Sequence, residues 1–195
     1  MRARVILMCL LGFAAARPAA AQQTESANPE YDRFHEFIQN TIKSPAWQVE
    51  AFGAGLIDQV SDFPKEWDNQ SDPFLKREVA RFGQAFTASI IEAGAAEAMH
   101  YHVGYERCGC SGAGRRLGHT FVHTFIVSRV DGRYGLNTPF LISRYGAATI
   151  ANAWYPDSYK IGTVVGQGTA SLGTAVGLNV LDEFGPDILH FLHLH

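Results

Sequence analysis

The chain has 195 residues, and 16 Lys and Arg against 19 Asp and Glu give a formal net charge of −3 at pH 7. This acidic balance excludes the basic surface that nucleic-acid binding requires, so no nucleic-acid partner is expected. The length suits one domain with a sizeable core. Composition alone identifies neither a reaction nor a ligand.

The first 21 residues have the three regions of a secretory signal peptide. Arg2 and Arg4 form a basic start, residues 5–16 an apolar run, and residues 19–21 a small-residue cleavage site. The run is too short to span a bilayer. Cleavage removes three of the 16 basic residues and none of the 19 acidic ones, so the mature chain carries −6. We therefore expect an exported protein, periplasmic or associated with the outer membrane, in which the polar residues 22–30 form a disordered leader.

Helical periodicity predicts a single all-α domain over residues 31–195, built as a compact bundle of five to seven helices. Helix starts are predicted at three pairs of a capping residue and a proline, Ser44-Pro45, Asp72-Pro73 and Thr138-Pro139, because proline at the first helical position loses no hydrogen bond. Trp154-Tyr155-Pro156 and Gly185-Pro186 predict helix ends. The expected helices are 31–43, 45–61, 73–103, 113–128, 139–154 and 159–184, with a short helix from Pro186 to the C-terminus.

One strand signal interrupts this pattern. An Asp-Gly turn at Asp131-Gly132 follows a run, Thr124 to Val130, that is compatible with a strand. The sequence therefore allows one small hairpin near 124–138.

The segment 161–181 contains glycine but no charged residue. Gly162 and Gly166 are four residues apart, as are Gly173 and Gly177, and each glycine costs a helix about 1 kcal/mol relative to alanine. We expect these four glycines to be helix-packing residues that allow close backbone approach. The segment suits a helix buried in protein or one in contact with lipid, and its polar residues make it only mildly hydrophobic.

The stretch 106–123, ERCGCSGAGRRLGHTFVH, holds the two cysteines that remain after processing, Cys108 and Cys110. An oxidising compartment favours a disulfide, and Gly109 supplies the bend that a spacing of one residue requires. A zinc site is the alternative, because His119 and His123 project from one helix face, although zinc-binding cysteines are usually further apart. Free or intermolecularly paired thiols are a third possibility. We expect the disulfide to stiffen the turn that aims residues 113–128 into the bundle, with His119 hydrogen-bonded back to the turn.

Other patterns in the chain are weaker. Arg115 and Arg116 follow a Gly-x-Gly and would suit an anion-binding helix start. Two carboxylate–histidine pairs three apart resemble half of a di-iron site: Glu97 with His100, and Asp187 with His190. No nucleophile–base pair is evident, so no catalytic residue is assigned and an enzyme is not expected.

Four segments together carry a resemblance: RCGCSG, His119, YGAATIANAWYP and GLNVLDEFGPDI. This combination resembles a group of uncharacterised exported bacterial proteins with an Arg-Cys-x-Cys-x-Gly turn, a Trp-Tyr-Pro helix end and a Gly-rich C-terminal helix ending in Glu-Phe-x-Pro-Asp. The resemblance covers roughly Ala80 to Ile188. It implies a shared pattern at Cys108, Cys110 and His119, and no activity.

These observations lead to two hypotheses about function. The first is an exported cell-envelope protein without a cofactor, with a structural or interaction role at or near a membrane, whose partner is a membrane surface or an envelope protein. The alternative is a metal-binding protein, with zinc as the metal, or a thiol-redox protein. It would use Cys108, Cys110, His119 and His123.

Overall fold

The computed structural model describes residues 46–69, 71–102, 104–157 and 160–191. This part of the chain is all-α with one small hairpin, as the sequence predicts. The expected signal peptide at 1–21, the expected leader at 22–30 and the helix expected at 31–43 lie outside the described residues. In chain order the elements are α3 (Ala46–Val60), the short 3-10 helix η2 (Lys65–Trp67), α4 (Pro73–Met99), α5 (Ala113–Phe125), β1 (Ile126–Ser128), β2 (Tyr134–Leu136), α6 (Thr138–Ala151) and α7 (Ile161–Phe191).

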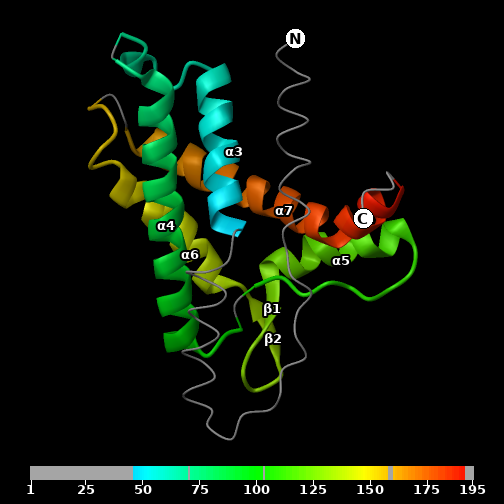
Figure 1. Cartoon of the computed structure of the whole chain (residues 1–195). Coiled ribbons are helices and arrows are strands. Elements are labelled where there is room, and N and C mark those ends of the chain that lie inside the picture. Colours follow the sequence, from blue (N-terminus) through cyan, green and yellow to red (C-terminus); the bar gives the residue numbers. More distant parts are fainter. Residues whose placement is uncertain (1–45, 70, 103, 158–159, 192–195) are drawn as a thin grey trace, which may run out of the picture.

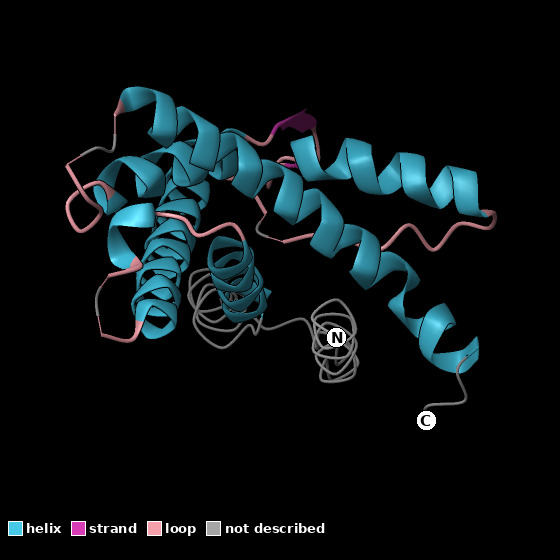
Figure 2. Ribbon diagram, turned by 90° about the horizontal axis from the view of Figure 1, so that it is seen from above, coloured by secondary structure: helices cyan, strands magenta, loops and turns pink. Residues whose placement is uncertain are grey.

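Helix α4 forms the centre of the bundle, with α3 and α6 packed along it (Figure 1). The long helix α7 connects two parts of the molecule. Its first half packs on α6, where Tyr145 meets Thr169, and its second half packs on α5, where Asn179 meets Thr124 (Figure 2). The antiparallel pair β1–β2 lies between α5 and α6 in the chain, with Val127 opposite Gly135.

Small residues form the helix crossings around α4. Ten alanines are buried in the described helices: Ala51, Ala80, Ala85, Ala88, Ala93, Ala96, Ala147, Ala148, Ala151 and Ala175. Alanine allows helix axes to approach closely without the entropic penalty of glycine. At one end of α4 the ring of Trp67 stacks on Tyr155, with 5.1 Å between ring centroids. The predicted helix crossings at small residues are therefore confirmed, and the small residue buried at these crossings is alanine.

The four glycines expected to be packing residues do not lie at crossings. Gly162, Gly166, Gly173 and Gly177 are all exposed, and a Cβ atom on any of them would meet no atom within 4 Å. The close approach is at Gly168, where a Cβ would lie 2.4 Å from the Tyr145 ring. The prediction was wrong because spacing identifies a helix face but not the side of it that meets a neighbour. None of the described helices is long and apolar enough to cross a membrane.

These environments predict opposite effects for the same substitution. Gly168→Ala should lower the free energy of unfolding by about 1–3 kcal/mol, because the new methyl group overpacks against Tyr145. Gly173→Ala should raise it by about 0.5–1 kcal/mol, because alanine has the higher helix propensity at an open position. Urea denaturation of the two variants measures both values, and equal effects would contradict the assigned faces of α7.

Helix α6 begins differently from the expectation. Its cap is Asn137, whose Oδ1 accepts a 3.2 Å hydrogen bond from the Phe140 N–H, and Thr138 is already helical. Asp72, before α4, lies at a φ of 55° and makes no capping bond through its side chain. Proline at the first turn therefore marks both starts more reliably than the residue before it.

The expected break at Gly185-Pro186 is absent, and α7 continues through Pro186. Proline removes one backbone hydrogen bond from a helix interior. Here Arg116 of α5 binds Glu183, on the turn before Pro186, and Asp187, just after it. These two ion pairs, one on each side of Pro186, compensate for the lost hydrogen bond and keep the helix continuous.

Candidate functional site

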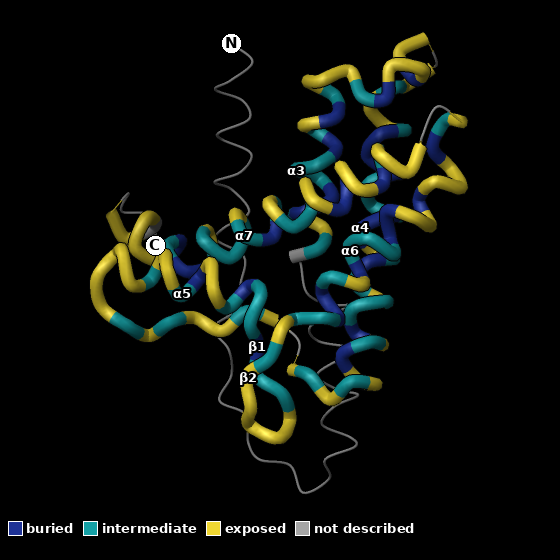
Figure 3. The backbone as a smooth tube through the Cα atoms, turned by 180° about the vertical axis from the view of Figure 1, so that it is seen from behind, coloured by how far each residue is buried: buried dark blue, intermediate teal, exposed yellow. Residues whose placement is uncertain are grey.

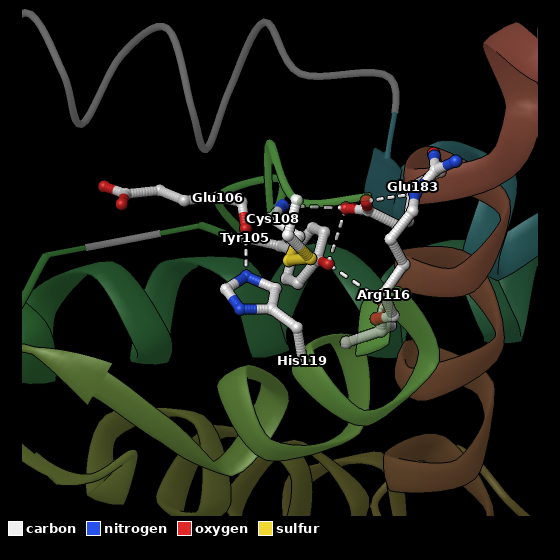
Figure 4. The surroundings of a disulfide bond; sticks show 8 residues. Tyr105, Glu106, Cys108, Arg116, His119 and Glu183 are labelled. Carbon is white, nitrogen blue, oxygen red and sulfur yellow. Dashed lines mark hydrogen bonds and ion pairs between the residues drawn. A yellow bond between two sulfur atoms is a disulfide. The ribbon is translucent and has the colours of Figure 1, made fainter. Parts of the chain in front are cut away.

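Cys108 and Cys110 form a disulfide in the loop that leads into α5, with their Cα atoms 5.0 Å apart (Figure 4). Gly109 between them has a φ of +58° and Gly112 a φ of +91°. Glycine adopts these values without the steric penalty that other residues carry. Of the three possibilities that the sequence left open for these cysteines, the structure therefore has the disulfide.

Glu183 of α7 holds this turn in place. Its buried carboxylate accepts hydrogen bonds from the Cys108 N–H at 3.0 Å and from the Tyr105 hydroxyl at 2.9 Å. The Tyr105 hydroxyl also lies 2.9 Å from the Thr120 hydroxyl of α5. One carboxylate thus connects the disulfide turn, α7 and, through Tyr105, α5 (Figure 4).

Arg116 supplies the positive charge opposite Glu183. Its Nε donates to Glu183 Oε1 at 2.8 Å, and its guanidinium lies 4.4 Å from the centroid of the Phe184 ring. Burial alone would raise the pKa of Glu183, but hydrogen bonds from Arg116, Cys108 and Tyr105 hold that pKa below its ordinary value. The anion expected at the arginine pair is therefore a carboxylate of the chain itself.

His119 bonds back to the turn, as expected. Its Nε2 lies 3.0 Å from the Glu106 carbonyl oxygen, and its ring stacks on His123 with 4.0 Å between centroids. Burial and the neighbouring His119 lower the pKa of His123. The spacing of four between the histidines produces this stacked pair.

The metal interpretations find little support in these positions. Within the described residues no group of three or more His, Cys, Asp or Glu side chains is placed to hold a metal ion. The sulfurs of a disulfide also lack the thiolate that zinc requires. Neither the set Cys108, Cys110, His119 and His123 nor the two carboxylate–histidine pairs come together as a metal site.

Helix α5 lies on α7 with its polar face inward. Thr120 and Thr124 are buried, and the Thr124 hydroxyl accepts a 3.0 Å hydrogen bond from the Asn179 amide of α7. Large apolar residues point outward: Leu117 is 52% exposed, Phe121 59% and Val122 49%. Figure 3 shows the outer side of α5 as exposed. The sequence predicts that α5 enters the bundle, but its interface with α7 is hydrogen-bonded and its apolar side faces away.

Sequence reasoning missed Glu183 and Tyr105 as parts of the site. A signal for Glu183 existed, because Asp182 and Glu183 are the first charged residues of α7 after 21 uncharged positions. Tyr105 carried no comparable signal. The groups of this site mostly bind one another, so the arrangement is suited to fixing the turn and α5 on α7.

No family model, no curated protein and no solved structure matches the chain. The residues of the site must therefore carry any functional argument by themselves.

Proposed function

We propose that the protein is an exported, non-catalytic protein of the cell envelope that attaches peripherally to a membrane surface through α5. The observation that carries this proposal is the exposure of large apolar side chains on α5. Its threonines face α7 while Leu117, Phe121 and Val122 face outward. A soluble helix normally buries its apolar face, so an apolar outer face is typical of an interaction surface.

The contacts around Glu183 support a rigid surface. Arg116, in the first turn of α5, is tied to α7 by its ion pairs with Glu183 and Asp187. Thr124, in its last turn, is tied by Asn179. A helix fixed at both ends presents its side chains without a further ordering penalty on binding.

A lipid interface suits this surface. Amphipathic helices lie in the plane of a membrane with Leu and Phe side chains inserted among the acyl chains. Leu117 and Phe121 are one turn apart, and Phe121 contacts Phe125 with ring centroids 5.6 Å apart. The acidic net charge disfavours attachment by attraction to anionic lipids. We therefore expect apolar insertion to dominate, with weak dependence on salt.

Sedimentation with phosphatidylcholine vesicles tests this proposal. The purified protein should pellet with vesicles in both low and high salt, and carbonate should release it from native membranes without detergent. The double variant Leu117→Ser/Phe121→Ser should bind at least about 10-fold less, because two large apolar side chains no longer insert.

Ile57 and Val79 provide a matched control, because they are 63% and 62% exposed on α3 and α4. Ile57→Ser/Val79→Ser should leave vesicle binding unchanged. Absence of binding by the parent protein, or equal losses in both double variants, would rule out α5 as a membrane-binding surface. The thiol-redox alternative rests on the partly buried Cys108–Cys110 disulfide and stays a prediction.

A further inference from the structure

A cavity of about 90 Å³ lies between α3, α4, α6 and α7, and the α5 site contributes no residue to it. Short side chains create this space, since six alanines line it: Ala51, Ala54, Ala85, Ala88, Ala147 and Ala170. Large apolar residues would normally fill such a position between four helices. The space is therefore available to a ligand or to water.

Two ion pairs form part of the cavity wall, and their carboxylates lie eight residues apart on α3. Glu50 accepts from Arg144 Nη1 at 2.7 and 2.8 Å and from the Ser171 hydroxyl at 2.8 Å. Asp58 accepts from Arg81 through Nε at 2.6 Å and Nη2 at 2.8 Å. The carboxylates are more than nine-tenths buried, with Glu50 8% and Asp58 3% exposed.

The wall also has unused hydrogen-bonding capacity. Arg144 Nε is buried and, within the described part of the chain, has no hydrogen-bond partner. Gln84 accepts a 3.1 Å hydrogen bond from Arg81 through Oε1, so its amide donors are not used in that bond. A ligand that supplies an acceptor to the Gln84 amide gains affinity here, because a buried donor without an acceptor is unfavourable.

The fixed charges of the lining cancel. Two arginines face two carboxylates, Glu50 and Asp58. Glu92 also lies 3.5 Å from Arg144, and burial raises its pKa, which favours the uncharged acid. A ligand with one net charge would therefore leave that charge uncompensated in a desolvated space, and an apolar ligand would leave polar groups unsatisfied.

We propose that the cavity binds a small zwitterion of the α-amino acid class, with its carboxylate on an arginine of the wall and its ammonium on a wall carboxylate. Size supports this class. A cavity of about 150 Å³ holds benzene, so this one, at about 90 Å³, suits about four non-hydrogen atoms, and glycine, with five, is the smallest member of the class. The site is independent of the attachment proposed for α5, and either can fail without the other.

Isothermal titration calorimetry with glycine tests the proposal on the purified protein. Saturable binding is expected with a dissociation constant of roughly 0.01–10 mM, the range open to so small a ligand. Acetate and methylammonium each carry one of the two charged groups, and each should bind at least about 10-fold more weakly. No saturable heat with glycine would mean that the cavity holds water only, and equal binding of acetate or methylammonium would overturn the zwitterion.

Filling the cavity should remove binding. Ala54→Leu on α3 should weaken glycine binding at least about 10-fold, and Ala170→Leu on the opposite wall should do the same if the first variant fails to fold. Ala98→Leu is the matched control, because Ala98 is exposed on α4 outside the cavity. Glycine binding that survives both filling variants would place the ligand elsewhere.

Discussion

Glu183→Ala should lower the free energy of unfolding by about 3 kcal/mol. The substitution leaves the Tyr105 hydroxyl and the Cys108 N–H without their common acceptor and removes the buried counter-charge of Arg116. Breaking a buried ion pair by removing one partner is among the most destabilising changes known. Urea denaturation at pH 7 measures the effect.

The adjacent residue provides the control. Asp182 pairs with Arg107 at 2.8 Å, but Arg107 is 49% exposed, so Asp182→Ala should change stability by less than about 1 kcal/mol. Equal effects of the two substitutions would show that Glu183 does not anchor the turn.

The parent protein and the Glu183→Ala variant should also differ in how their stability depends on pH. The pKa of Glu183 is lowered in the folded state, so its contribution is present above the ordinary value of 4.5 and is lost as pH falls through the folded pKa. The stability difference between the parent and Glu183→Ala should therefore shrink below about pH 4.5. A difference that stays constant down to acid unfolding would contradict the bonded carboxylate.

Local sequence signals predicted the elements that depend on local chemistry. Proline at the first helical turn located α4 and α6, and Asp131-Gly132 located the hairpin. The continuous α7 could not be predicted in this way, because its helix passes Pro186 with the help of Arg116, 70 positions earlier. A contact so distant in sequence leaves no periodic trace.

The orientation of α5 shows a second limit. Apolar periodicity normally indicates the buried face, which would turn Leu117 and Phe121 inward. The neighbouring stripe with Thr120 and Thr124 is buried instead, because α7 offers Asn179 and Glu183 as hydrogen-bonding partners. The disulfide and the bond from His119 to the turn were predictable, since they join residues at most 13 apart.

Glu78 of α4 presents a different buried carboxyl group, for which the described residues supply no hydrogen-bond donor. Its side chain packs against α3 so closely that a Cβ on Gly55 would lie 2.4 Å from Oε1. In the described part of the chain neither carboxyl oxygen has a hydrogen-bond partner. Burial, followed by the negative charge of Asp58, raises the pKa of Glu78 to about 7.

Because the pKa of Glu78 is raised in the folded state, ionisation of its carboxyl group destabilises the folded protein. The folded state holds the Glu78 proton more tightly than the unfolded chain, so stability falls as pH rises from about 4.5 to 7 and stays low above that. Glu78→Gln is uncharged at every pH and has nearly the same shape. It should match the parent at pH 5 and exceed its free energy of unfolding by roughly 1–3 kcal/mol at pH 8.5.

Denaturation of both proteins between pH 5 and 9 measures this difference. A Glu78→Gln difference that is flat across this range would show that the carboxyl is solvated between α3 and α4. A difference that grows through pH 7 would show that the Glu78 carboxyl stays desolvated against Gly55 of α3. The uncharged amide of glutamine would then remove the cost of burying the ionised acid.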